Sequence, residues 1–154
     1  MDNVITADVS NTSTKQLFAL GDYFYNPATA TTYRYVHANG ATSQYGFVSI
    51  STDGLFEATP LTTTTNASTN PLLVGAAQCA FADDEYGWVA VKGYFTGNFA
   101  ASCVQDVKIY TTATAGVVDD ASTTLINGLK LITTITTAAS APCFACAEMT
   151  TAAA

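Results

Sequence analysis

The stretch YGWVAVKGYFTGNFA, residues 86–100, decides the fold of this chain. Aromatic and β-branched residues are frequent in it, no run of helix formers interrupts it, and its glycines suit places where a strand bends or another backbone comes close. Strand alternation places Val89, Val91 and Phe95 on one face and Trp88 on the other. Because both faces carry large side chains, we expect a central strand with these four residues in the core.

The rest of the chain predicts further short strands separated by turn signals. They occupy residues 16–25, 32–37, 45–50, 72–81, 103–111, 125–135 and 143–149. A turn signal at 52–54 precedes a short run, 55–58, that could pair back on 45–50 as a hairpin, and a turn at 113–116 before Val117 and Val118 indicates a second hairpin with 103–111. The run 72–81 is compatible with a strand or a short helix, and its length and Gly75 favour a strand. The strand at 125–135 alternates, which places Leu129 and Leu131 in the core.

No segment repeats apolar residues at helical spacing. We therefore predict an all-β fold, namely a single-domain antiparallel β-sandwich or barrel of about eight short strands. This β-domain comprises residues 15–154 and follows an N-terminal arm, residues 1–14.

The arm is polar, and its large apolar residues are Val4, Ile5 and Val9. Such a segment buries too little apolar area by itself to offset the entropy lost on ordering, so it is either a frayed terminus or is held by a partner. We hypothesise that Val4, Ile5 and Val9 contact that partner.

Composition and charge exclude several classes of partner. The chain has 154 residues, enough for one domain, a net charge of −7, and five basic residues scattered singly. Nucleic acid and anionic membranes attract clustered Lys and Arg, so neither is expected as a partner. Residues 1–21 show no leader pattern and no long apolar run follows, which predicts neither a signal peptide nor a membrane span. Only 11% of residues are charged, against roughly 25% in soluble domains, which suits a chain packed against other proteins.

The cysteines invite a zinc or redox interpretation, because Cys143 and Cys146 form a CxxC motif. Zinc would need a second ligand pair, and Cys79, Cys103 and His37 lack ligand spacing. A redox motif should open a helix after a strand, whereas this one lies in a small-residue stretch. We therefore interpret the cysteines as small buried hydrophobic residues, or as one incidental disulfide.

Acidic runs and the single histidine are the remaining candidates for chemistry. Residues 83–85 are Asp-Asp-Glu, which could hold calcium but lack the alternating ligands and glycine of a calcium loop, so a solvated turn is the preferred interpretation. His37 is the sole histidine, and no nucleophile motif or phosphate loop accompanies it. Asp119 and Asp120 fall in a turn where water would screen them. The sequence predicts no catalytic site, no metal and no cofactor.

Several segments resemble the small head decoration, or capsid cement, proteins of tailed bacteriophages. The segments are LGDYFYNPATATTYRYVH (20–37), VGAAQCAFADDEYGWVAVKGYF (74–95), KIYTTATAGVVDDA (108–121) and LING (125–128). The pieces YRYV, EYGWVAVKG and YTTATAGVVDD, in this order and at similar separations, carry the resemblance. The end SAPCFACAEMTTAAA (140–154) does not match.

The resemblance implies a non-enzymatic virion protein that binds the outer capsid surface and stabilises the shell. Its partners would be the major capsid protein and other copies of itself, as a dimer or trimer on the shell, assembled in the bacterial cytoplasm. Many copies would make small interfaces add up. The alternative is a carbohydrate-binding or adhesive β-domain, in which tyrosines such as Tyr23, Tyr25, Tyr33 and Tyr35 stack on sugar rings.

Overall fold

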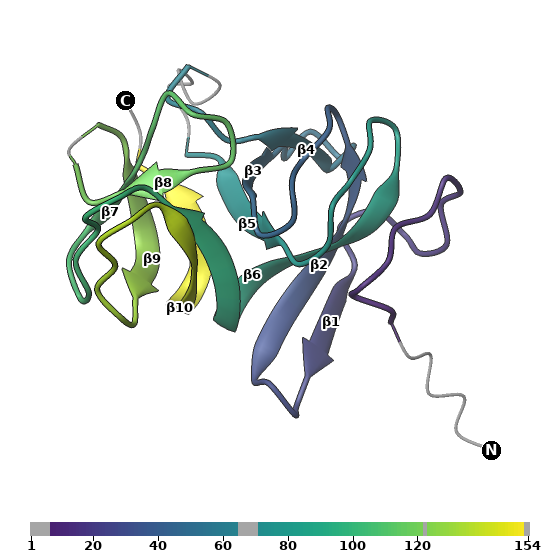
Figure 1. The fold of residues 1–154 in the computed structure, drawn as a ribbon. Helices are drawn as coiled ribbons and strands as arrows, with labels where there is room; N and C mark the ends of the chain where they lie inside the picture. The colour runs from purple at the N-terminus through teal and green to yellow at the C-terminus, as the bar shows by residue number, and fades with distance from the viewer. Residues whose placement is uncertain (1–6, 65–70, 122, 153–154) are drawn as a thin grey trace.

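The computed structural model describes residues 7–64, 71–121 and 123–152, and these residues form an all-β structure (Figure 1). Within the described residues there are ten strands and no helix, which confirms the predicted fold class and corrects the strand number upward from about eight. The strands are β1 (Tyr23–Asn26), β2 (Thr31–Ala38), β3 (Phe47–Ile50), β4 (Glu57–Pro60), β5 (Leu73–Ala77), β6 (Tyr86–Phe99), β7 (Ile109–Thr111), β8 (Val118–Asp119), β9 (Leu125–Leu131) and β10 (Ala139–Thr151). No apolar helix of membrane-spanning length occurs in the described part of the chain.

Strand pairing closes the sheet on itself twice. Strands β2, β4, β3, β5 and β6 pair in that order and β6 pairs again with β2, which we call the first ring. Strands β6, β8, β7, β9 and β10 pair in that order and β10 pairs again with β6, which we call the second ring. Figure 1 shows the two rings side by side with β6 running through both. Closure leaves few free strand edges.

The long strand β6 joins the rings because its two halves have different neighbours. Its first half, from Tyr86 to Lys92, pairs with β2, and its second half, from Gly93 to Phe99, pairs with β10. The predicted strand at 86–100 is therefore confirmed within one residue, and its central position follows from these pairings.

A bulge divides the two halves of β6. Thr32 lies opposite Lys92 while Tyr33 lies opposite Ala90, so Val91 is the extra residue. Gly93 follows with a φ of 92°, and a Cβ at this position would meet the carbonyl oxygen of Ala30. Only glycine fits there without strain.

The bulge changes which residues share a face. Val89 and Val91 lie in the core of the first ring, whereas Phe95 lies in the same cluster as Trp88. The prediction that Phe95 shares a face with Val89 and Val91 was wrong, because the extra residue shifts the alternation by one position. Trp88, Val89, Val91, Phe95, Leu129 and Leu131 are nevertheless all buried, at 7% exposure or less.

Two hydrophobic clusters fill the molecule. The first ring encloses small and β-branched side chains from its five strands together with Phe81. A larger cluster fills the second ring and continues over the outer face of β2 and β6, where Trp88 contacts the rings of Phe18, Phe24 and Tyr35. The aromatic layer therefore packs residues 18–24 onto the sheet.

Two hairpin predictions hold, whereas the predicted strands at 16–25 and 103–111 are strands only at their ends. The turn at 52–54 joins β3 and β4, which pair antiparallel, and β7 and β8 form the predicted hairpin. Residues 16–25 were predicted as one strand, but only the end of this segment is β1. The preceding residues turn instead, because Gly21 has a φ of 85° and Phe18 points its ring onto Trp88.

Candidate functional site

The described part of the arm lies against the β-domain. Ser13 forms an isolated antiparallel bridge with Tyr86, and the Thr12 hydroxyl donates a hydrogen bond to Glu85 at 2.7 Å. Val9, one of the three proposed partner contacts, is half-buried and packs against the core. The other two, Val4 and Ile5, lie outside the described residues.

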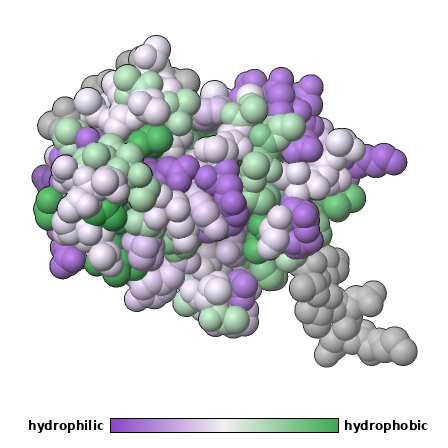
Figure 2. All heavy atoms as spheres, viewed as in Figure 1, coloured by the Kyte–Doolittle hydropathy of each residue, from purple (hydrophilic) through white to green (hydrophobic). Residues whose placement is uncertain are grey.

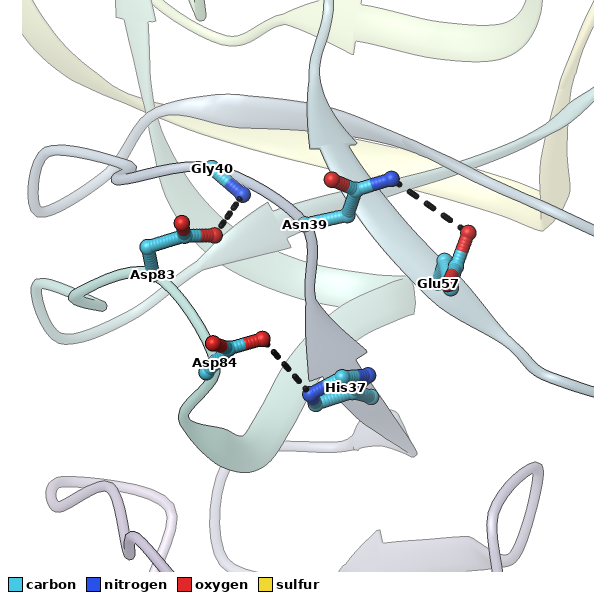
Figure 3. A network of polar contacts seen from close by, with 6 residues as sticks. All are labelled: His37, Asn39, Gly40, Glu57, Asp83 and Asp84. Carbon is cyan, nitrogen blue, oxygen red and sulfur yellow. Dashed lines mark hydrogen bonds and ion pairs between the residues drawn. The ribbon is translucent and has the colours of Figure 1, made fainter.

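His37 belongs to a polar network at the end of β2 (Figure 3). Its ring stacks on Tyr86 with centroids 4.5 Å apart, and its Nε2 lies 3.6 Å from a carboxylate oxygen of Asp84. Nearby, the backbone amide of Gly40 donates a hydrogen bond to the Asp83 carboxylate, and the side-chain amide of Asn39 donates one to the Glu57 carboxylate. These contacts fix the turns that surround His37.

The acidic run at 83–85 distributes its carboxylates among separate partners. Asp83 accepts from Gly40, Asp84 faces His37, and Glu85 accepts from the Ala82 amide at 2.9 Å. The Ala82 hydrogen bond, together with the one from Thr12, lowers the pKa of Glu85. A calcium site needs several oxygens around one point. The run acts as the predicted turn, and each of its three acids has a different partner.

The structure gathers a thiol and two carboxylates that the sequence separates. Cys103, Asp119 and Asp120 place one potential ligand atom each within 4.8 Å of one another. Burial, and then the neighbouring charges of Asp120 and Asp119, raise the pKa of Cys103 to about 11, so this thiol is protonated at neutral pH. Asp120 already accepts from the Val104 amide and Asp119 from the Asp120 amide. The group therefore ties the end of β8 to residues 103–104. The carboxylates of Asp119 and Asp120 are engaged in these structural hydrogen bonds.

The CxxC motif is split across the two sides of β10. Cys143 is fully buried and its thiol donates to the Phe95 carbonyl oxygen, whereas Cys146 is exposed. Burial raises the pKa of Cys143 far above its usual range. Two strand residues that point to opposite sides cannot bridge. All four cysteines are free, so the incidental disulfide left open above is not present.

A buried cation that the sequence did not single out connects the rings. Arg34 of β2 is 7% exposed and forms an ion pair with Glu148 of β10 at 2.9 Å. Its guanidinium carbon lies 4.2 Å from the centroid of the aromatic ring of Tyr23 and 5.2 Å from that of Phe56. The only signal available was the position of this arginine between two tyrosines.

Large apolar side chains also reach the surface in two parts of the molecule. Leu17, Tyr23, Tyr25 and Leu55 are exposed on the N-terminal segment, β1 and the turn before β4, and Tyr94, Val104, Val107 and Ile132 are exposed on the second ring. Figure 2 shows strongly hydrophobic residues at the surface of the lobe that holds β7, β8 and β9. Isolated apolar residues are normal on a surface, but grouped ones mark contact sites.

The tyrosines proposed to stack on sugars divide between core and surface. Tyr33 and Tyr35 are buried at 6% and 2% exposure, and Tyr23 has Arg34 over its ring. Only Tyr25, 58% exposed, has its ring open among these four. The arrangement offers a sugar ring a single platform.

Comparison with known proteins adds no further assignment: no protein-family model matches the sequence, and no curated protein matches it.

Proposed function

We propose that this chain is a non-enzymatic virion structural protein that binds the outer surface of an assembled bacteriophage capsid and stabilises the shell. It does so by contacting neighbouring subunits of the major capsid protein, in many copies. The observation that carries the proposal is that large apolar side chains are exposed in two parts of one body, on β1 with the segment before it and on the second ring. A protein that cements a shell needs two contact surfaces held at a fixed separation.

The shared strand provides that fixed separation. Because β6 runs without interruption from Tyr86 to Phe99 through both rings, the rings cannot rotate freely about a linker. The ion pair between Arg34 and Glu148 adds a second connection. A rigid body loses less entropy on bridging two subunits than two tethered domains would.

The size of the molecule is compatible with such bridging. The accessible surface is 7504 Å², and a standard interface takes about 800 Å² per partner, or roughly a tenth of it. Two interfaces of this size would still leave most of the protein facing water. Individually weak contacts add up when many copies decorate one shell.

The segments that resemble capsid cement proteins lie in β6 and in elements that pair with it. YRYV is in β2, EYGWVAVKG opens β6, and YTTATAGVVDD forms the β7–β8 hairpin. Strand β2 pairs with β6, and β8 pairs with β6 through Phe99 and Val118. The resemblance therefore supports a shared framework around β6.

A carbohydrate-binding role is the weaker candidate, because sugar-binding sites use several exposed rings and polar groups around one sugar. Of the four tyrosines considered, two are buried and one is covered by Arg34.

The test is to add the purified protein to shells assembled from the major capsid protein of the same genome. We expect saturable binding to the outer surface, visible as added density by electron cryomicroscopy, and a higher temperature of shell disruption. The copies are expected to contact one another or adjacent capsid subunits. Glycan binding without shell binding would refute the proposal.

A further inference from the structure

Two neighbouring hollows lie beside β9 on the second ring and share part of their lining. One, of about 320 Å³, lies between the segment before β7 and the strand β9, and the other, of about 230 Å³, lies between β9, β10 and β6. Asp106 and Lys130 line both hollows. We call this surface the lysine groove.

Apolar side chains form the floor of the lysine groove. The rings of Tyr94 and Phe144 lie 4.7 Å apart on neighbouring strands, and Lys130 follows Phe144 in the same cross-strand row. Ile132 and Val107, 41% and 39% exposed, border this floor. Cross-strand aromatic pairs are rigid, so the floor is a preformed platform.

Two cations line this surface, because Lys130 belongs to both hollows and Lys108 to the one of about 320 Å³. Neither the Lys108 nor the Lys130 ammonium forms an ion pair with a carboxylate in the part of the chain that the structure describes. Asp106 is the single acid in the lining of either hollow. The protein as a whole is acidic, with a net charge of −7, whereas this surface carries two lysines and one acid.

We propose that the lysine groove binds an extended acidic segment of a partner protein, with aliphatic side chains on the platform and carboxylates at Lys108 and Lys130. Charge complementarity selects the acidic partner, because the unpaired ammonium groups attract carboxylates and repel a basic chain. The groove follows β9, whose seven residues span roughly 23 Å, which matches an extended peptide rather than a globular knob.

The source of this segment rests on the proposed function: on a shell, the segment belongs to a capsid subunit. The chemistry of the groove itself does not depend on that source. Two lysines in a chain of net negative charge cannot replace the counterions along a nucleic acid, so a polyanionic nucleic acid does not fit.

The experiment measures binding of a fluorescein-labelled peptide of alternating leucine and glutamate to the full chain. We expect saturable binding that weakens with salt, and a loss of roughly tenfold or more in Lys130→Glu. Lys15→Glu, the same charge change at an exposed residue of the N-terminal segment, should bind as the unaltered protein does. An alternating leucine–lysine peptide should not bind. Far-UV circular dichroism checks that both variants remain folded.

Equal affinity in the two variants, equal binding of the lysine peptide, or no saturable binding would each overturn the proposal. So would a dimer in sedimentation that Lys130→Glu abolishes, because the groove would then hold a second copy. Shell binding separates the two claims. Shell binding that Lys130→Glu leaves unchanged overturns the groove alone, whereas peptide binding without shell binding supports the groove and refutes the proposed function.

Discussion

Replacing Trp88 by alanine tests the packing of the aromatic layer. The indole is 3% exposed and contacts three rings, with centroids 5.1 Å away at Phe18, 5.9 Å at Phe24 and 5.0 Å at Tyr35. Burying about 200 Å² of tryptophan at about 25 cal/mol per Å² contributes about 5 kcal/mol. Alanine retains part of this area and the neighbours relax partly, so Trp88→Ala should lower the free energy of unfolding by about 4 kcal/mol.

Urea denaturation followed by far-UV circular dichroism measures this loss, since Trp88 is the sole tryptophan and its fluorescence disappears in the variant. For a domain of this size the midpoint of thermal unfolding should fall by about 8–16 °C. Trp88→Phe keeps an aromatic ring and should cost less. Tyr94→Ala is the matched control, because Tyr94 lies on the same strand but is 55% exposed, and it should cost about 1 kcal/mol or less. A loss below about 1 kcal/mol in Trp88→Ala would refute the packing argument and make the indole a surface group.

Three further predictions concern the bulge, the buried ion pair and a buried thiol. In urea denaturation, Gly93→Ala should lower the free energy of unfolding by about 3 kcal/mol and Gly54→Ala by about 1 kcal/mol, because both glycines have positive φ but only Gly93 faces a backbone carbonyl. Equal losses in the two variants would contradict this reasoning. Arg34→Met should lower the free energy of unfolding by about 2–3 kcal/mol because it leaves Glu148 unpaired, and the double variant with Glu148→Gln should recover part of this loss. Strictly additive losses would show that the two residues are uncoupled. Burial raises the pKa of Cys103 from 9.0 to about 11, so the unfolded chain loses this proton at lower pH than the folded one, and the free energy of unfolding should fall between pH 9 and 11. The fall with pH should be less steep in Cys103→Ala, and an equally steep fall would mean that other groups cause it.

The strands were predictable because their signal is local. Alternation and β-branched content mark residues 86–100, and a turn signal at 52–54 marks the hairpin of β3 and β4. Each of these depends on residues within a few positions of one another. The face of Phe95 was not predictable, because a single extra residue at Val91 inverts every later position and leaves no composition signal of its own.

The candidate sites lay beyond the sequence for a related reason. Cys103 meets Asp119 only through the β7–β8 hairpin, and Arg34 meets Glu148 because β2 and β10 both pair with β6. The lysine groove likewise combines residues of β6, β9 and β10. Lys130 looked like a scattered surface cation until the structure placed it beside Phe144.

Sequence patterns alone were enough to predict that this chain is all-β, that one long strand is central, and that six named residues are buried. These predictions follow from side-chain alternation and β-propensity, which act within a strand. The closure of the sheet into two rings around β6, and the two lysines that line one groove, are visible only in the folded molecule. Ring closure depends on which strands pair and in what register, and that is set by contacts between residues far apart in the chain.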